Sequence, residues 1–267
     1  MSSNYCPEPP HTAIASISAA DDNQKIHAKD LLHFCAMPSR VIAIGDIHGC
    51  GQALRALIES IQPEPDDTVI TLGDCVDRGP ESCQVIDELL ALGQKCSVIP
   101  LCGNHEEMML NYLDSKPQPD NWLLCGGAQT VESYRDASGK MNAIPDEHVD
   151  YIRTWRDFYE TPSHFFVHGA YQPDQPLVDQ RWQNWRWHSI RDMVPGVHIS
   201  GKTAVVGHTP QKDGEVLNLG HILCIDTYCW GGGWLTALDT TTGQVWQADR
   251  RGQLRHDLPA LQPEKPV

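Results

Sequence analysis

Short apolar runs followed by glycine-containing polar turns recur along the chain. Three of these runs occupy residues 40–44, 68–72 and 97–102, and each is rich in isoleucine, valine or leucine. Runs of this length with β-branched residues are typical of buried strands. A stretch with helical spacing follows each run, so the sequence predicts three successive strand–turn–helix units and a largely parallel central layer.

Apolar residues three and four positions apart predict the helices of these units. In the first unit, Leu54, Leu57 and Ile61 lie on one helical face. In the second, residues 80–90 are predicted to be helical, with a proline at the first helical position, where proline is favoured. The third helix is expected over residues 107–113.

The pattern changes in the second half of the chain. Residues 114–163 predict a helical insertion beside the site, with a helix over residues 146–160. Residues 171–203 are rich in tryptophan and are expected to be irregular. Further strands are predicted at residues 164–167, 204–206 and 222–225, followed by a terminal β-hairpin of residues 234–238 and 244–248.

Segments without regular periodicity flank the patterned region. Residues 1–38 are expected to be an N-terminal extension that is partly disordered, with a short helix within residues 25–36. Residues 251–267 are expected to form a loose C-terminal tail. A single catalytic domain would then occupy residues 39–250.

The composition narrows the choice of partners and compartment. The 267 residues carry a net charge of -15, which argues against nucleic acid as a partner and leaves no basic patch for a membrane surface. No apolar stretch approaches the ~20 residues of a membrane span, and no signal peptide is evident. None of the ten cysteines forms a Cys-x-x-Cys pair, which argues against a zinc ribbon or a thioredoxin-type site. Most of them lie in apolar runs, so a reduced, cytoplasmic protein is expected.

Metal-ligand side chains follow five of the predicted strands. They are Asp46, His48, Asp74, Asn104, His168 and His208. Carboxylate, imidazole and amide donors suit Mn, Fe or Zn at five or six coordination. Six ligands are too many for one catalytic ion with an open position, so two ions that share one carboxylate fit better. In this interpretation a metal-bridging hydroxide is the nucleophile.

Three sequence blocks carry a resemblance to a known family. They are Gly45-Asp46-Ile47-His48-Gly49, Gly73-Asp74-Cys75-Val76-Asp77-Arg78-Gly79 and Gly103-Asn104-His105-Glu106. The blocks, with the later His168-Gly169 and Gly207-His208, resemble the phosphoprotein phosphatase family within the calcineurin-like metallophosphoesterases. The resemblance covers about residues 40–248 and implies a two-sheet β-sandwich flanked by helices, in the mixed α/β class.

The same resemblance implies a role for each ligand. Asp46 and His48 would hold the first metal, Asp74 would bridge, and the second metal would be held by Asn104, His168 and His208. Manganese is the expected metal at both positions, with iron or zinc as alternatives.

The resemblance also implies the groups that act on the phosphoryl group. His105 would be the general acid, oriented by Asp77. Arg78 and Asn104 would bind the phosphoryl oxygens. Arg186 is the candidate for a second arginine of the family, in competition with Arg181 and Arg191. Apart from the resemblance, the tryptophan- and glycine-rich residues 230–234 are candidates to line the cleft, although Trp234 at a strand start is also expected in the core.

These features favour a bacterial-type serine/threonine protein phosphatase that acts on phosphoproteins or phosphopeptides, and they leave its regulatory partners open. A dinucleoside tetraphosphate hydrolase is the alternative, because it shares the Gly-Asp-x-His-Gly-Cys start that Cys50 permits. Residues 76–79 and Glu106 favour the phosphatase. A catalytically silent metal-binding scaffold would not need both His105 and Asp77.

Overall fold

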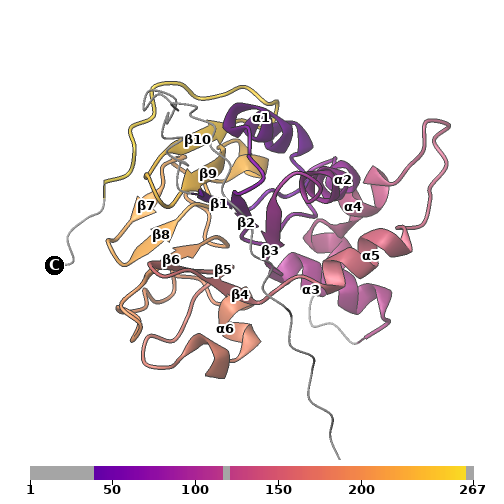
Figure 1. Ribbon diagram of the computed structural model, residues 1–267. Helices are drawn as coiled ribbons and strands as arrows, with labels where there is room; N and C mark the ends of the chain where they lie inside the picture. The colour runs from indigo at the N-terminus through magenta and orange to yellow at the C-terminus, as the bar shows by residue number, and fades with distance from the viewer. Residues whose placement is uncertain (1–38, 117–120, 263–267) are drawn as a thin grey trace, which may run out of the picture. The chain divides into compact units, whose positions relative to one another are not determined.

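The computed structural model describes residues 39–116 and 121–262, so the helix expected within residues 25–36 lies outside the described residues. In this part of the chain, two five-stranded sheets face each other, with helices on the outer side of the first sheet (Figure 1). The expected mixed α/β sandwich is thereby confirmed. None of the described helices is long and apolar enough to cross a membrane.

The first sheet is formed by the strands of the three predicted strand–turn–helix units and by the C-terminal hairpin. Its strand order is β10-β9-β1-β2-β3. The parallel strands are β1 (Val41–Ile44), β2 (Thr68–Thr71) and β3 (Ser97–Pro100), and the antiparallel hairpin is β9 (Leu235–Asp239) and β10 (Val245–Ala248). The helices that follow the parallel strands are α1 (Gly51–Ile61), α2 (Ser82–Leu92) and α3 (Asn104–Leu113).

Two helix starts differ from the sequence prediction. Helix α2 begins at Ser82, so Pro80 precedes the helix instead of opening it. Helix α3 begins at Asn104, three residues before the predicted start. Asn104 and His105 therefore lie in the first helical turn, and their side chains are fixed by helical backbone geometry.

The insertion after α3 contains η1 (Trp122–Cys125), α4 (Gly127–Ser133) and α5 (Asp146–Arg153). The prediction of one helix over residues 146–160 is wrong for its second half. The chain leaves the helix after Arg153 and forms β4 (Phe158–Glu160), which pairs antiparallel with β5. Trp155 and Tyr159 happen to continue the helical spacing, but sheet pairing outweighs that weak local preference.

The second sheet has the order β4-β5-β6-β8-β7. Its parallel strands are β5 (His164–Val167), β6 (Thr203–Val206) and β8 (Ile222–Cys224), and β7 (Leu217–Asn218) is an antiparallel edge strand. The region expected to be irregular includes η2 (Leu177–Asp179) and α6 (Trp182–Trp187), and η3 (Cys229–Gly231) follows β8. The two-residue β7 is too short to give a periodic signal in the sequence.

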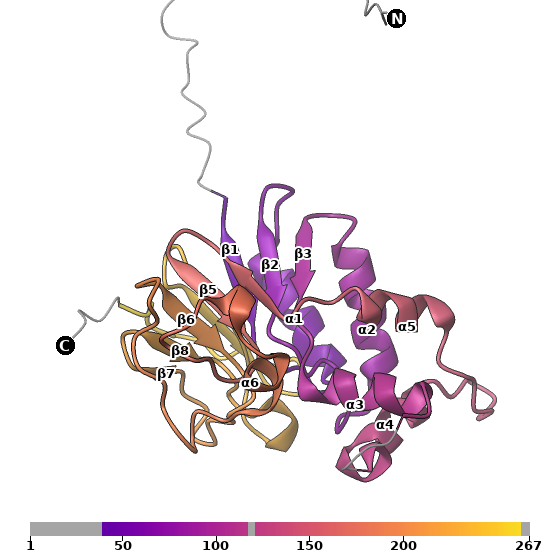
Figure 2. The ribbon, with the colours of Figure 1, turned by 90° about the horizontal axis from the view of Figure 1, so that it is seen from below.

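Alternating side chains place both faces of each sheet in buried layers. Ile42 and Ile44 of β1 pack in the cluster that includes α1 and α2, whereas Ala43 packs with Phe166 and Val205 of the second sheet. Figure 2 shows α1 and α2 on the side of the first sheet away from β5 and β6. The polar residues that follow the strands thus lie at the rim of a rigid, well-packed core.

The tail after Gly252 is more ordered than the expected loose segment. Leu254 forms a bridge with Ala248, and the N–H of Leu261 donates to the carbonyl oxygen of Gly243 at 2.8 Å. Leu258 and Leu261 also pack against the core between the sheets. The described part of the tail therefore packs on the domain because its leucines cover apolar surface.

Candidate metal centre

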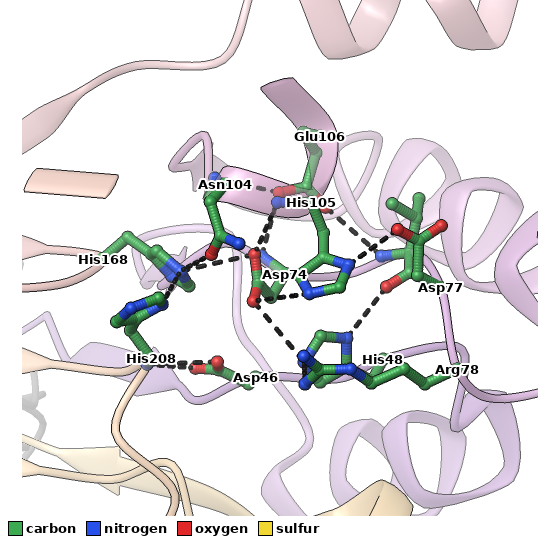
Figure 3. A network of polar contacts seen from close by, with 12 residues as sticks. Asp46, His48, Asp74, Asp77, Arg78, Asn104, His105, Glu106, His168 and His208 are labelled. Atoms are coloured by element: carbon green, nitrogen blue, oxygen red, sulfur yellow. Dashed lines mark hydrogen bonds and ion pairs between the residues drawn. The ribbon is translucent and has the colours of Figure 1, made fainter. Parts of the chain in front are cut away.

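The six ligand-type side chains meet where strands of both sheets end and α3 begins (Figure 3). Asp46 and His48 follow β1, Asp74 follows β2, Asn104 opens α3, His168 follows β5, and His208 follows β6. All are buried except His208, which is half-buried. Residues 162 positions apart become neighbours, since the N–H of His208 donates to both carboxylate oxygens of Asp46 at 3.1 Å.

The glycines before the ligands allow this close packing. A Cβ atom on Gly103 would lie 2.2 Å from Oδ1 of Asp74, and one on Gly207 would lie 2.1 Å from Oδ1 of Asp46. Both distances are far below van der Waals contact. A side chain at either position would displace a carboxylate of the cluster.

Asp74 lies at the centre of the cluster. Its Oδ2 atom is 3.4 Å from Nε2 of His48, and its Oδ1 atom is 3.3 Å from Nε2 of His168. Two groups have potential ligand atoms within 4.8 Å of one another: Asp74 with His48 and His105, and Asp74 with His168 and His208. One carboxylate therefore faces two adjacent positions for a cation.

The histidine tautomers fit cation binding. Nδ1 of His48 and Nδ1 of His168 lie 3.0 and 2.7 Å from main-chain carbonyl oxygens, which can only accept hydrogen bonds. Burial lowers the pKa of both imidazoles, so each is neutral and each Nε2 keeps a lone pair. Nε2 of His168 nevertheless lies 3.1 Å from Oδ1 of Asn104, another acceptor. A cation between these atoms would turn a repulsive arrangement into a favourable one.

Carboxylate repulsion favours cations at the same place. Burial, followed by the nearby charges of Asp226 and Asp74, raises the pKa of Asp46 well above its usual value. Burial likewise raises the pKa of Asp226 to about 7. Asp226 was not among the ligand-type residues expected from the sequence, although it also follows a strand, β8. The donor set and its excess negative charge fit two divalent cations.

His105 and Asp77 form a separate polar pair beside Asp74. Nδ1 of His105 lies 2.7 Å from Oδ2 of Asp77. Asp77 also accepts hydrogen bonds from Nε1 of Trp122 at 2.9 Å and from Oγ1 of Thr130 at 2.7 Å. Burial by itself would lower the pKa of His105, but Asp74 and Asp77 outweigh it and raise the pKa. The pair is therefore able to hold a proton on the imidazole.

Glu106 has a role that sequence reasoning missed. Its carboxylate accepts hydrogen bonds of 2.7–3.2 Å from the main-chain N–H groups of Asp74, Cys75, Val76 and Gly103. These bonds fix the turn that carries the central ligand against the start of α3. The available signal was its place three residues after Gly103, where a helix-capping glutamate is common.

Several site residues have left-handed backbone conformations that are unusual for residues other than glycine. Their φ angles are 44° for His48, 49° for Asp74, 72° for Asp77, 68° for Arg78 and 60° for His208. Such conformations cost of the order of 1–3 kcal/mol each and tend to gather at functional sites. The residue types at these positions do not predict a left-handed backbone.

Arg78 is the predicted phosphate-binding arginine that lies at the cluster. Its Nη1 atom donates to Nε2 of His48 at 2.7 Å, and its guanidinium lies over the ring of Trp230 with Cζ 4.7 Å from the ring centroid. The expectation that residues 230–234 line the cleft thus fits the position of Trp230. The ring holds the guanidinium in place by cation–π contact.

Two candidates for a second arginine, Arg186 and Arg191, contact groups outside the ligand set. Arg186 forms ion pairs with Asp157 at 2.5 Å and Glu107 at 3.3 Å. Arg191 donates to the carbonyl oxygen of Pro210, and Arg181 is exposed. Because two carboxylates already contact Arg186, its assignment to the phosphoryl group stays a prediction.

Comparison with known proteins identifies the family. The model of the family described as calcineurin-like phosphoesterase matches residues 39–231, and the chain belongs to this family. It is 29% identical to serine/threonine-protein phosphatase 1 of Salmonella typhimurium over 80% of this chain and 94% of that protein.

Dinucleoside tetraphosphatases are also similar, over shorter stretches. The symmetrical bis(5'-nucleosyl)-tetraphosphatase of a Janthinobacterium species is 29% identical over 49% of this chain and 43% of its own length. That of Acidovorax ebreus is 44% identical over 25% of this chain and 24% of its own length. The chain thus spans less than half the length of these tetraphosphatases.

Solved structures show the same fold. A protein described as a diadenosine tetraphosphatase superimposes with a TM-score of 0.61 at 20% identity, covering 80% of this chain and 94% of that one. A cold-active protein tyrosine phosphatase gives a TM-score of 0.57 at 16% identity, covering 81% and 78%. At these identities the likeness concerns the fold, and the chain is a metallophosphoesterase whose substrate must be argued from its own residues.

Proposed function

We propose that this metallophosphoesterase is a serine/threonine protein phosphatase that hydrolyses phosphoserine and phosphothreonine in proteins or peptides. The observation that carries the proposal is the buried 2.7 Å contact between His105 and Asp77, next to Arg78. A serine or threonine alkoxide is a poor leaving group and requires a proton. A nucleotide phosphate leaves more readily and gains less from a general acid.

Two divalent cations would be held by this chain's carboxylates and imidazoles. Asp46 and His48 would bind the first, Asn104, His168 and His208 the second, and Asp74 both. When bound, the pair would polarise the phosphoryl group and activate water for in-line attack. We propose manganese, because mixed oxygen and imidazole donors suit it, with iron and zinc as alternatives.

The remaining residues act on the substrate. Arg78 would bind the phosphoryl oxygens with its planar guanidinium, and the amide of Asn104 would add a hydrogen bond. His105 would protonate the leaving oxygen from Nε2. Asp77 would keep the ring oriented, since Trp122 and Thr130 hold its own carboxylate in place.

The similarity to the Salmonella phosphatase supports this substrate class, because it extends over most of both chains. A tetraphosphatase is the second candidate, supported by the 44% identity over a 68-residue stretch. We further propose that residues 39–250 form the catalytic unit, followed by a tail. We also propose a reduced, cytoplasmic location, because most cysteines lie in apolar runs, where they act as small buried hydrophobic residues.

The decisive experiment compares substrates with metal-stripped enzyme to which Mn²⁺ is returned. We expect turnover of a phosphoserine peptide and of p-nitrophenyl phosphate, and little turnover of diadenosine tetraphosphate. A higher kcat/KM for diadenosine tetraphosphate than for every peptide would replace the proposal with the tetraphosphatase. Absence of any turnover would favour the silent scaffold.

A further inference from the structure

A pocket with a volume of about 270 Å³ adjoins Arg78 on the side of α1 and the end of β10. Its charged lining consists of Arg78, Arg250, Arg251 and Glu81. The Glu81 carboxylate is engaged by the first turn of α1, since it accepts hydrogen bonds from the main-chain and side-chain nitrogens of Gln52. Three guanidinium groups against one engaged carboxylate make the pocket locally positive in a chain whose net charge is -15.

Arg250 and Arg251 differ from most arginines of this protein. Six others form ion pairs with carboxylates: Arg40, Arg55, Arg135, Arg153, Arg186 and Arg255. Within residues 39–116 and 121–262, the structure shows no such pair for Arg250 or Arg251, and both are exposed. Their guanidinium groups are therefore available to an anion from outside.

The backbone that carries these two arginines is held firmly. They occupy a tight turn in which the N–H of Gly252 donates to the carbonyl oxygen of Asp249 at 2.8 Å. The Asp249 carboxylate accepts from the N–H groups of Arg251 and Gln253 at 2.9 Å. Asp249 thus stabilises the turn through the main chain and leaves both guanidinium groups unpaired.

The surroundings of Trp230 bear on the kind of anion. The Arg78 guanidinium lies over one face of its ring, and the rings of Tyr228 and His48 meet it at interplanar angles of 67° and 83°, with centroids 5.0 and 6.1 Å away. A nucleobase could stack on the face covered by Arg78 only by displacing the phosphate-binding arginine. The pocket suits a compact anionic group, which the guanidinium forks can bind without stacking.

We propose that this pocket is a subsite for a second anionic group of a phosphopeptide, a carboxylate or a second phosphate close in sequence to the phosphoresidue. The inference rests on the proposed protein phosphatase function, because Arg78 borders both the pocket and the metal cluster. An anion seated between Arg250 and Arg251 would lie beside the residue being dephosphorylated. The subsite would select acidic phosphorylated sequences.

The test uses phosphoserine peptides in which one glutamate is placed at each of three positions on either side, with glutamine in the matched peptides. For the best position, the intact enzyme should prefer glutamate over glutamine in kcat/KM by roughly five- to tenfold, mainly through KM. The R250A/R251A variant should show nearly equal values for the two peptides. A peptide with a second phosphoserine in place of the glutamate should be preferred over the glutamine peptide at least as strongly. The R250A/R251A variant should lose that preference as well.

The K95A/K140A variant is the matched control, because it removes the same charge at two exposed lysines of the surface. It should keep the full preference for glutamate. Equal losses of preference in both double variants would show a general charge effect and overturn the subsite. The same conclusion would follow if the intact enzyme did not distinguish glutamate from glutamine at any position.

A binding measurement distinguishes failure of the subsite proposal from failure of the proposed phosphatase function. Calorimetry with Mn²⁺-loaded enzyme and phosphonate analogues of the glutamate and glutamine peptides measures affinity without turnover. If no peptide is hydrolysed but the glutamate analogue binds more tightly and R250A/R251A loses that difference, the subsite stands and the phosphatase proposal fails. If peptides are hydrolysed without any preference in rate or affinity, the subsite fails alone. Tight binding of diadenosine tetraphosphate that depends on Arg250 and Arg251 would overturn the peptide assignment.

Discussion

Arg78 joins three features at the level of the single residue: a left-handed backbone, the ring of Trp230 and the Nε2 atom of His48. Its guanidinium would contact the phosphoryl group in the ground state and in the transition state. We expect Arg78→Ala to raise KM and to lower kcat/KM by roughly 10²-fold on phosphopeptides. Metal content should not fall, because the variant removes a donor that competes for Nε2 of His48.

Steady-state kinetics and elemental analysis check this prediction. Arg55→Ala on the exposed side of α1 is the control, since its partner is Glu88 and not the cluster. Wild-type KM and kcat in Arg78→Ala would remove this arginine from the phosphoryl site.

His105 should separate acid catalysis from metal binding. If it protonates the leaving oxygen, His105→Asn should lower kcat on a phosphoserine peptide by on the order of 10²–10⁴-fold. The loss should be distinctly smaller for p-nitrophenyl phosphate, whose leaving group needs no proton. Asp77→Asn should show the same selectivity more weakly, because the ring is then less well oriented. Equal losses on both substrates with full metal content would instead indicate a positioning role.

Single residues also show which features of the site could be predicted from the sequence. The ligand types could be predicted because each follows an apolar run that ends a strand. The partners of Asp77 could not, since Trp122 and Thr130 lie 45 and 53 positions away in an insertion without a clear pattern. The left-handed backbone conformation of several ligands could not be predicted either, because tertiary contacts, and not residue type, impose it.

The elements of the first sheet are joined by a partly buried ion pair between Asp67 and Arg40. The Asp67 carboxylate accepts hydrogen bonds from the guanidinium and N–H of Arg40 and from the N–H of Glu64. Arg40 also donates to the carbonyl oxygens of Ile61 and Gln62 at the end of α1. The pair thus connects the start of β1, the end of α1 and the start of β2.

We expect Asp67→Asn to lower the free energy of unfolding at pH 7 by about 1–3 kcal/mol. Burial alone would raise the pKa of Asp67, but the hydrogen bonds from Arg40 and Glu64 outweigh it and lower the pKa. Because the folded pKa is below the unfolded one, the stabilisation is present at neutral pH and is lost as the pH falls through the folded pKa. Urea unfolding at pH 7 and at progressively lower pH should show the difference from wild type shrinking.

The neighbouring Asp66→Asn is the matched control, as Asp66 is exposed and has the same charge. It should leave stability at pH 7 nearly unchanged. A pH-independent effect of Asp67→Asn would show that its contribution comes from packing and not from the ion pair.

At the level of elements, periodicity identified the three strand–turn–helix units and the final hairpin, because long regular segments override local ambiguity. It failed at residues 146–160, where helical spacing continued by chance into β4. It also gave no sign of β7, and it suggested a loose tail where Leu258 and Leu261 cover the core. In these cases the partner strand or surface, which lies elsewhere in the chain, determines the structure.

For the whole molecule, the ligand cluster joins the two sheets. Asp46 and Asp74 follow strands of the first sheet, and His168 and His208 follow strands of the second. Divalent cations bound there would hold both sheets together and relieve the repulsion among the buried carboxylates. At a Mn²⁺ concentration 100 times the dissociation constant, linkage predicts about 2.7 kcal/mol of added stability. For a domain of this size that corresponds to a rise in Tm of roughly 5–10 °C.

Differential scanning calorimetry of metal-stripped enzyme with and without Mn²⁺ measures this rise. Asp74→Asn should remove most of it and should lower the content of both metals, because Asp74 is the carboxylate that faces both cation positions. Asp67 pairs with Arg40 and is not one of the ligands, so the Asp67→Asn variant is the control. It should have a lower Tm than wild type when metal is absent and should keep the full Mn²⁺-dependent rise in Tm. If Asp74→Asn binds two equivalents of metal and shows the wild-type increment, Asp74 does not bridge. If the wild-type Tm is indifferent to Mn²⁺, the cluster does not join the sheets through metal.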